Sequence, residues 1–325
     1  MELKEISNVK GEYAISAFGE YIVFFGKDIV IFHNSGVRIA RKKHLRNIYK
    51  VAVLSENRII IDCGSPGAYV ILSLTDGSEI CQIKHPKLDY TKNHFAVSPD
   101  CSVVYDCYCL REDFYLFRID LTTNESQSIY LQRGLRAITD IICDKDGIPC
   151  LLETHFEMVA GRHISINGVR YVYEDSLDPG DAFYWKEKWP LDFPDISSMF
   201  WKDADTVFTE KLNIYQIMSK EKRQLCAEGE DLKQFCPYPI SDLVMCQDGR
   251  YVILVYSNMD VIFDTVTWKV VARYAKNFYH GYLLHNEYWI CTEEGVQRKP
   301  FPCMEQIPPI KPIFWGGPIS DRFSR

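Results

Sequence analysis

The stretch "VMCQDGRYVILVYSNMDVIFDTVTWKVV" (residues 244–271) decides the fold. It contains an apolar run, an Asp-Gly turn, a second apolar run, a polar break and two further short runs rich in β-branched residues. Apolar runs of about four to eight residues separated by Gly, Asn and Asp are typical of β-strands joined by hairpins. The stretch therefore predicts four short antiparallel strands in succession.

The same pattern recurs along the whole chain. A short apolar run, a tight turn and a second β-rich run begin each of seven units, whose turns lie in residues 14–20, 50–56, 94–100, 139–147, 197–204, 242–249 and 282–287. A third and a fourth run follow in most units. Four short strands in about 40 residues match the repeat length of a β-propeller blade. We therefore predict an all-β fold, a β-propeller of seven four-stranded blades, as a single domain over residues 1–325.

Two β-sandwiches of about 150 residues each would also give short strands and turns. Seven units with a similar phase favour the propeller over this alternative. Helix-forming residues are concentrated in residues 219–235, where Gly229 interrupts them.

The end of the third strand resembles that of a WD repeat. In residues 261–269 an aromatic residue and an acid, Phe263 and Asp264, precede a turn, and Ile119 and Asp120 are a weaker match. No Trp-Asp and no Gly-His dipeptide occurs in the sequence. The similarity to WD-repeat propellers covers most of the chain, and it implies a ring of blades that acts as a scaffold for protein or peptide partners.

The seventh unit ends early, because a Pro-rich tail follows at residues 304–325. We expect residues 1–8 to form the outermost strand of the last blade, since an open sheet edge would invite pairing with other chains. The tail contains Phe314 and Trp315, so it either packs across the propeller or offers an extended ligand to another protein.

The charge balance limits the partners. Lys and Arg number 37 against 44 Asp and Glu, which gives a net charge of −7 and disfavours the basic footprint of nucleic-acid binding. Residues 38–46 carry five Arg or Lys, which we interpret as a solvated outer edge. We find no signal-peptide pattern and no apolar run of about 20 residues. We expect a cytoplasmic protein, a monomer, with no nucleic-acid and no membrane partner.

The cysteines and carboxylates do not predict a metal site. Twelve Cys lie mostly inside apolar runs, as buried reduced thiols would. Residues 144–147 (Asp-Lys-Asp-Gly) fit the start of a calcium loop, but its twelfth position is His155, where such a loop needs Glu. We interpret them as a two-residue hairpin loop that would place Cys143 opposite Cys150. We expect no metal and no cofactor.

The candidate binding residues lie in an aromatic-rich segment. The spacing between the fourth and fifth turns expands to about 58 residues, so residues 174–196 are predicted to be an insertion, and long insertions are usually functional or disordered. Trp and Tyr beside acids are typical of interface anchors and of sugar stacking. We propose Tyr184, Trp185 and Trp189 as anchors and Glu187 and Asp192 as the polar rim. The alternative is that the aromatics merely cap the blade edges.

Two functions remain open from the sequence. The first is a non-enzymatic scaffold for protein–protein or peptide interaction. The second is a carbohydrate-active propeller enzyme, in which two carboxylates from different blades would act about 5 to 10 Å apart. No motif identifies catalytic residues.

Overall fold

A computed structural model describes most of the chain. The described residues are 4–84, 94–110, 113–133, 136–159, 162–173, 185–191, 199–203, 205–209, 213–216, 221–224, 242–246, 249–256, 258–267, 269–275 and 279–306. They form one short helix, α1 (Lys4–Ser7), and seven antiparallel sheets, which we number 1 to 7 in chain order. Sheets 1 to 6 have four strands, and sheet 7 has three among the described residues.

The first half of the chain forms sheets 1 to 3. Sheet 1 contains β1 (Tyr13–Phe18), β2 (Tyr21–Gly26), β3 (Ile29–His33) and β4 (Arg38–Lys42). Sheet 2 contains β5 (Arg46–Ser55), β6 (Arg58–Ser65), β7 (Ala68–Ser73) and β8 (Glu79–Lys84). Sheet 3 contains β9 (Ala96–Val97), β10 (Val103–Leu110), β11 (Asp113–Asp120) and β12 (Glu125–Arg133).

The second half forms sheets 4 to 7. Sheet 4 contains β13 (Arg136–Cys143), β14 (Pro149–Val159), β15 (Arg162–Tyr173) and β16 (Trp185–Leu191). Sheet 5 contains β17 (Met199–Asp203), β18 (Thr206–Thr209), β19 (Asn213–Gln216) and β20 (Glu221–Gln224). Sheet 6 contains β21 (Asp242–Cys246), β22 (Tyr251–Val255), β23 (Met259–Asp264) and β24 (Lys269–Ala275). Sheet 7 contains β25 (Tyr282–Leu284), β26 (Glu287–Thr292) and β27 (Gly295–Pro300).

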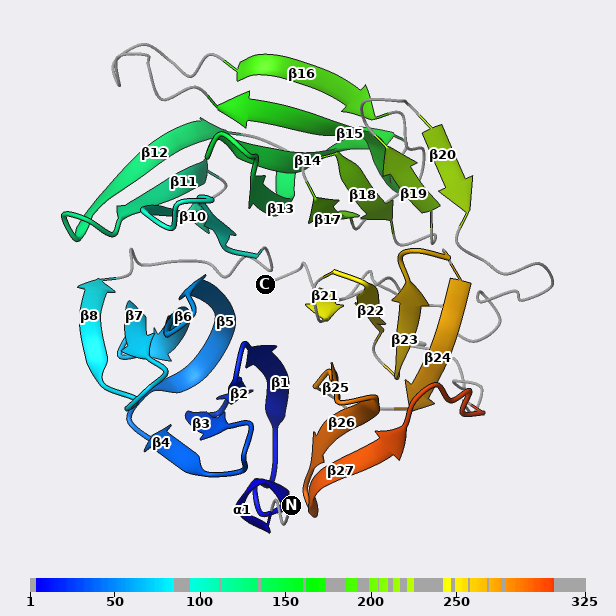
Figure 1. Cartoon of the computed structure of the whole chain (residues 1–325). Helices are drawn as coiled ribbons and strands as arrows, with labels where there is room; N and C mark the ends of the chain where they lie inside the picture. Colours follow the sequence, from blue (N-terminus) through cyan, green and yellow to red (C-terminus); the bar gives the residue numbers. More distant parts are fainter. Residues whose placement is uncertain are drawn as a thin grey trace, which may run out of the picture.

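The sheets stand in a ring, with the first strand of each sheet nearest the centre and the last strand at the rim (Figure 1). The middle strands are buried on both faces: β3 reads Ile-Val-Ile-Phe, and every residue of β23 is buried. A strand with alternating burial would bury only one face, so these continuously buried strands reflect sheets packed on both sides. Buried side chains therefore lie on both faces of these sheets.

Each sheet packs against the next in chain order. Separate clusters of buried side chains join sheets 1 and 2, sheets 2 and 3, and sheets 3 and 4. The first strands β13, β17 and β21 connect sheets 4, 5 and 6. One cluster combines side chains of sheets 6, 7 and 1, and β1 contacts β25 and β26. The first and last sheets of the chain are therefore neighbours.

Three buried hydrogen bonds join a tyrosine to an aspartate. Tyr13–Asp28 lies within sheet 1, and the other two, Tyr69–Asp106 and Tyr288–Asp260, connect neighbouring sheets. Tyr69–Asp106 joins sheets 2 and 3, where Lys50 Nζ also lies 2.6 Å from Asp106 Oδ1. Tyr288–Asp260 joins sheets 6 and 7. A buried carboxylate needs such donors, because burial without partners costs several kcal/mol, of the order of 3 to 5 when one partner of an ion pair is lost.

The N-terminus differs from the prediction. Residues 4–7 form α1 rather than the outermost strand of sheet 7, and residues 1–3 lie outside the described part. The helix contacts β27, and after it Gly11 N–H donates a 2.9 Å hydrogen bond to the Thr292 carbonyl. Gly295 permits this contact, since a Cβ there would lie 2.3 Å from the Ser7 carbonyl oxygen at a φ of +138°. The strand prediction failed because residues 1–6 lack an alternating apolar face.

Five of the cysteines that the structure describes are buried, and these are Cys63, Cys107, Cys150, Cys246 and Cys291. Burial raises the pKa of the Cys246 thiol to about 12, so it stays protonated and unreactive. Within the described ranges, no helix is long and apolar enough to cross a membrane.

Candidate functional site

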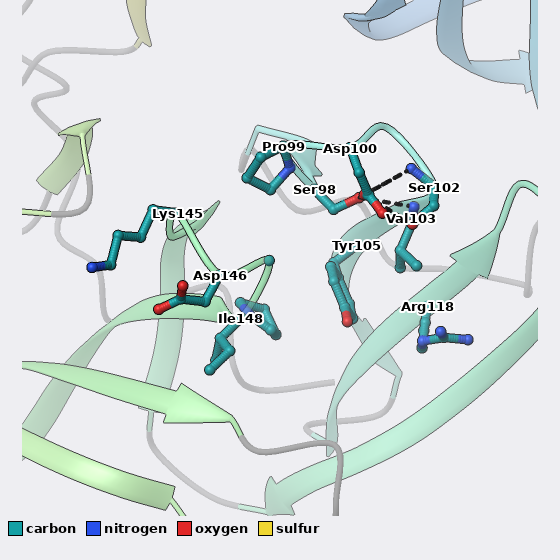
Figure 2. Close-up of a pocket in the computed structure, with 12 residues that line it drawn as sticks. Ser98, Pro99, Asp100, Ser102, Val103, Tyr105, Arg118, Lys145, Asp146 and Ile148 are labelled. Carbon is teal, nitrogen blue, oxygen red and sulfur yellow. Dashed lines mark hydrogen bonds between the residues drawn. The ribbon is translucent and has the colours of Figure 1, made fainter.

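A cavity of about 410 Å³ lies between sheets 3 and 4. The β9–β10 loop forms one side of it and the β13–β14 loop forms the other. Figure 2 shows Pro99 and Asp100 on one side and Asp146 and Ile148 on the other, with Tyr105 beside them. The cavity thus lies where hairpin loops of two neighbouring sheets meet.

Asp100 organises the β9–β10 loop. Its Oδ1 accepts hydrogen bonds from Ser98 Oγ at 2.6 Å, from the Ser102 backbone N–H at 3.1 Å and from Ser102 Oγ at 2.9 Å. The hydrogen bonds from Ser98 and Ser102 hold the pKa of Asp100 below its usual value. Cys101 adopts a φ of +57°, which closes the turn. The loop therefore keeps a fixed shape and a permanent negative charge.

Asp144 plays the same part in the β13–β14 loop. Its Oδ1 accepts the backbone N–H groups of Asp146 and Ile148, both at 2.9 Å. This confirms a turn at the Asp-Lys-Asp-Gly motif, but the loop has five residues rather than two. Cys143 consequently pairs with Pro149, so the predicted pairing of Cys143 with Cys150 is wrong. The longer loop is stable because the Asp144 carboxylate accepts hydrogen bonds from its backbone N–H groups.

The remaining lining is largely apolar and comes from the strands below the loops. Tyr105 is 3% exposed and lies on β10, next to Val103 on the same edge of the cavity. Pro149 opens β14 on the opposite side. Arg118 of β11 also lines the cavity, and its Nη2 lies 3.5 Å from Asp120 Oδ2. The strands thus supply a rigid floor, and the loops supply most of the polar groups.

A second polar cluster lies among the innermost strands. His94 precedes β9, Asp140 lies in β13 and Asp242 begins β21. His94 Nδ1 is 3.0 Å from Asp140 Oδ1, and its Nε2 is 3.0 Å from Asp242 Oδ1. Burial lowers the pKa of His94, but the charge of Asp140 and hydrogen bonds to both carboxylates raise it well above its usual value. The imidazolium therefore links sheets 3, 4 and 6.

This cluster bears on the enzyme alternative. Burial raises the pKa of Asp242, but the hydrogen bond and the charge of His94 lower it by more. The pKa of Asp242 therefore lies below its usual value. A glycosidase needs a general acid with a raised pKa. The two carboxylates instead share a cation, so their arrangement is that of an ion-pair network. In the described part of the chain, no group of three or more His, Cys, Asp or Glu is arranged to hold a metal ion.

Sequence reasoning missed both the cavity and the His94 cluster. A signal for the cluster was present, because His94, Asp140 and Asp242 occupy the same position relative to the turn in three aligned units. Polar residues at the start of innermost strands face the region where all units converge. No comparable signal existed for the cavity, since its volume depends on how two loops are spaced.

The structure describes three of the five predicted binding residues. Trp185, Glu187 and Trp189 lie in β16, the fourth strand of sheet 4, where Trp189 is opposite Arg170. Residues 185–191 of the expected insertion are therefore regular strand. Tyr184 and Asp192 lie outside the described residues.

Solved structures share this arrangement of sheets. A hydrazine synthase of Kuenenia stuttgartiensis matches with a TM-score of 0.59 and 13% identity, over 90% of this chain and 97% of that chain. The β-propeller domain of Cps50 (Swd1) from Myceliophteria thermophila matches with a TM-score of 0.57 and 12% identity, over 89% and 98%. The fold is a β-propeller. The WD-like propeller resemblance is thereby confirmed at the level of the fold, in which a four-stranded antiparallel sheet corresponds to a blade.

Comparison of the sequence with known proteins does not assign the chain to a family. No protein-family model and no curated protein sequence matches this chain. At 12 to 13% identity, the structural matches carry the fold and not the activity of those proteins.

Proposed function

We propose that this protein is a non-enzymatic binding scaffold, a seven-bladed propeller that holds an extended segment of a protein partner in the cavity between blades 3 and 4. The seven sheets in ring order support the blade number. We further propose that it acts as a monomer in the cytoplasm.

The cavity carries this proposal. Ligand sites in proteins usually measure about 300 to 1,000 Å³ and combine an apolar lining with a few placed polar groups. At about 410 Å³, this cavity lies at the small end of that range, which suits one or two side chains rather than a large cofactor. Its sides are loops fixed by Asp100 and Asp144, so the site is formed before a ligand arrives.

Position on the fold supports the same conclusion. Propellers present loops on a rigid ring, and binding residues occur mostly in loops held by a rigid scaffold. Here the two loops come from neighbouring blades whose strands share a buried cluster that includes Leu116, Ile141 and Leu151. A bound segment would therefore contact two blades at once without reorganising either.

A random-peptide display library selected on the purified protein tests the proposal. We expect peptides that bind the wild type and lose at least tenfold in affinity on Ile148→Glu, measured by fluorescence anisotropy. The matched control is Val266→Glu, which makes the same kind of change at the β23–β24 turn, where Val266 is 73% exposed. Failure to select any peptide, or equal affinity for wild type and Ile148→Glu, would refute the proposal.

A further inference from the structure

We propose that the cavity between blades 3 and 4 receives a basic side chain, Lys or Arg, from the bound segment. This inference rests on the proposed function and names the chemistry that the site selects. The cavity and its apolar floor define the site, and the charges around it decide which side chain enters.

The two cationic residues of the lining, Arg118 and Lys145, do not point their charges into the cavity. Arg118 lies 3.5 Å from Asp120, whose pKa is held at about 2 by hydrogen bonds from Thr122 and Thr123 and by Arg118 itself. Asp120 is therefore ionised at any physiological pH and offsets the charge of Arg118. Lys145 is exposed, and in Figure 2 its side chain extends away from the other lining residues. Neither cation is placed to attract an anion into the cavity.

The carboxylates of the lining are not neutralised in this way. Asp100 is bound by hydroxyl and amide donors of Ser98 and Ser102, which keep it ionised without cancelling its charge. Asp146 is exposed at the tip of the β13–β14 loop, and its backbone N–H, not its carboxylate, holds the turn. Among the described residues, neither carboxylate forms an ion pair with Lys or Arg. Each loop thus contributes to the lining one carboxylate that forms no ion pair with Lys or Arg among the described residues.

The floor fits the stem of the same side chain. Lys and Arg bury their aliphatic carbons against apolar surface while the charged end reaches polar groups. Val103, Ile148 and Pro149 supply that surface, and the Tyr105 ring can face a cation favourably. The net charge of −7 adds a long-range attraction for basic segments.

The expected effects are modest for each charge, because the carboxylates are solvent-exposed. Exposed ion pairs contribute about 0.2 to 1 kcal/mol, which corresponds to about 1.4- to 5-fold in affinity. Asp146→Asn should therefore weaken binding by up to about fivefold, and Asp146→Lys, which replaces attraction by repulsion, by about tenfold or more.

The probe is the set of peptides selected from the random library. We expect them to be enriched in Lys or Arg, to lose affinity when that residue is replaced by Gln, and to bind more weakly as salt is raised from 50 to about 300 mM. Asp146→Lys should abolish most of the binding. Glu56→Lys is the matched control, because Glu56 is an exposed acid in the corresponding β5–β6 turn of sheet 2. Circular dichroism of both variants checks that the fold is intact.

The outcomes separate the two proposals. Selected peptides that lack basic residues, or that bind Asp146→Lys as well as wild type, would overturn the inference while the binding cavity stands. Peptides whose affinity falls equally on Asp146→Lys and Glu56→Lys would also overturn it, because attraction to the whole acidic protein explains that result. No selected peptide at all would refute the proposed function, and this inference with it.

Discussion

Replacing His94 with Ala should destabilise the ring at its centre. The substitution removes the cation that lies 3.0 Å from both Asp140 and Asp242 and leaves two carboxylates facing each other. Breaking a buried ion pair by removing one partner costs about 3 to 5 kcal/mol, whereas exposed pairs contribute about 0 to 1 kcal/mol. The Asp140 side chain is 1% exposed, but those of His94 and Asp242 are 39% and 36% exposed. We therefore expect an intermediate loss, about 2 to 3 kcal/mol.

The pH dependence gives the sharper test. A histidine whose pKa is raised in the folded state binds its proton more tightly there than in the unfolded chain, where the pKa is about 6.5. Its contribution is therefore fully present below about pH 6.5 and is lost as the pH rises through the folded value. The difference in unfolding free energy between wild type and His94→Ala should be largest near pH 6 and should shrink at alkaline pH.

Urea unfolding of both proteins at several pH values between about 6 and 10 measures this difference directly. The other groups near the cluster, such as His280, are common to both proteins and cancel to first order. His94→Ala combined with Asp242→Asn should lose less than the sum of the single variants, because both remove the same interaction. A difference below about 0.5 kcal/mol near pH 6, or one that grows as the pH rises, would refute the ion-pair reasoning.

Three further predictions follow from other contacts. Gly295→Ala should lower the free energy of unfolding by more than about 1 kcal/mol, because the new methyl group would meet the Ser7 carbonyl oxygen at the end of α1. Urea unfolding measures this loss, and Gly19→Ala in the β1–β2 turn, where the methyl group meets open space, is the control. Asp106→Asn should cost about 3 to 5 kcal/mol by urea unfolding, since it leaves the buried ammonium of Lys50 without its carboxylate. Trp185→Ala with Trp189→Ala should keep the fold by circular dichroism but weaken partner binding if β16 is an anchor. Unchanged affinity would instead favour the alternative that these tryptophans only cap the edge of the sheet.

The repeat predicted the architecture well because it depends on local chemistry. The turn residues and the apolar runs of residues 242–264 fix strands β21 to β23 almost where the sequence placed them. The ends were harder to predict, because closing a ring depends on contacts between distant segments. Gly295 and α1 illustrate this, since the close approach of Ser7 to β27 has no signature in either segment alone.

The structure of the predicted insertion, residues 174–196, was harder to predict for a different reason. Residues 185–191 belong to the segment predicted to be an insertion because the spacing between turns is long, and the structure forms them into the strand β16. The extra length is taken up partly by β14 and β15, which have 11 and 12 residues and are longer than most strands of the ring. A repeat interval alone does not distinguish longer strands from a longer loop.

The cluster and the cavity share one short strand, and this connects the stability of the ring with the proposed binding site. β9 has only two residues, Ala96 and Val97, with His94 just before it and the Asp100 loop just after it. A strand this short makes few ladder hydrogen bonds of its own, so its position depends on what holds its ends. His94 fixes one end to Asp140 of the very blade that forms the opposite side of the cavity. The spacing between the two loops, and so the volume offered to a side chain, is therefore set in part by an ion pair at the centre of the ring.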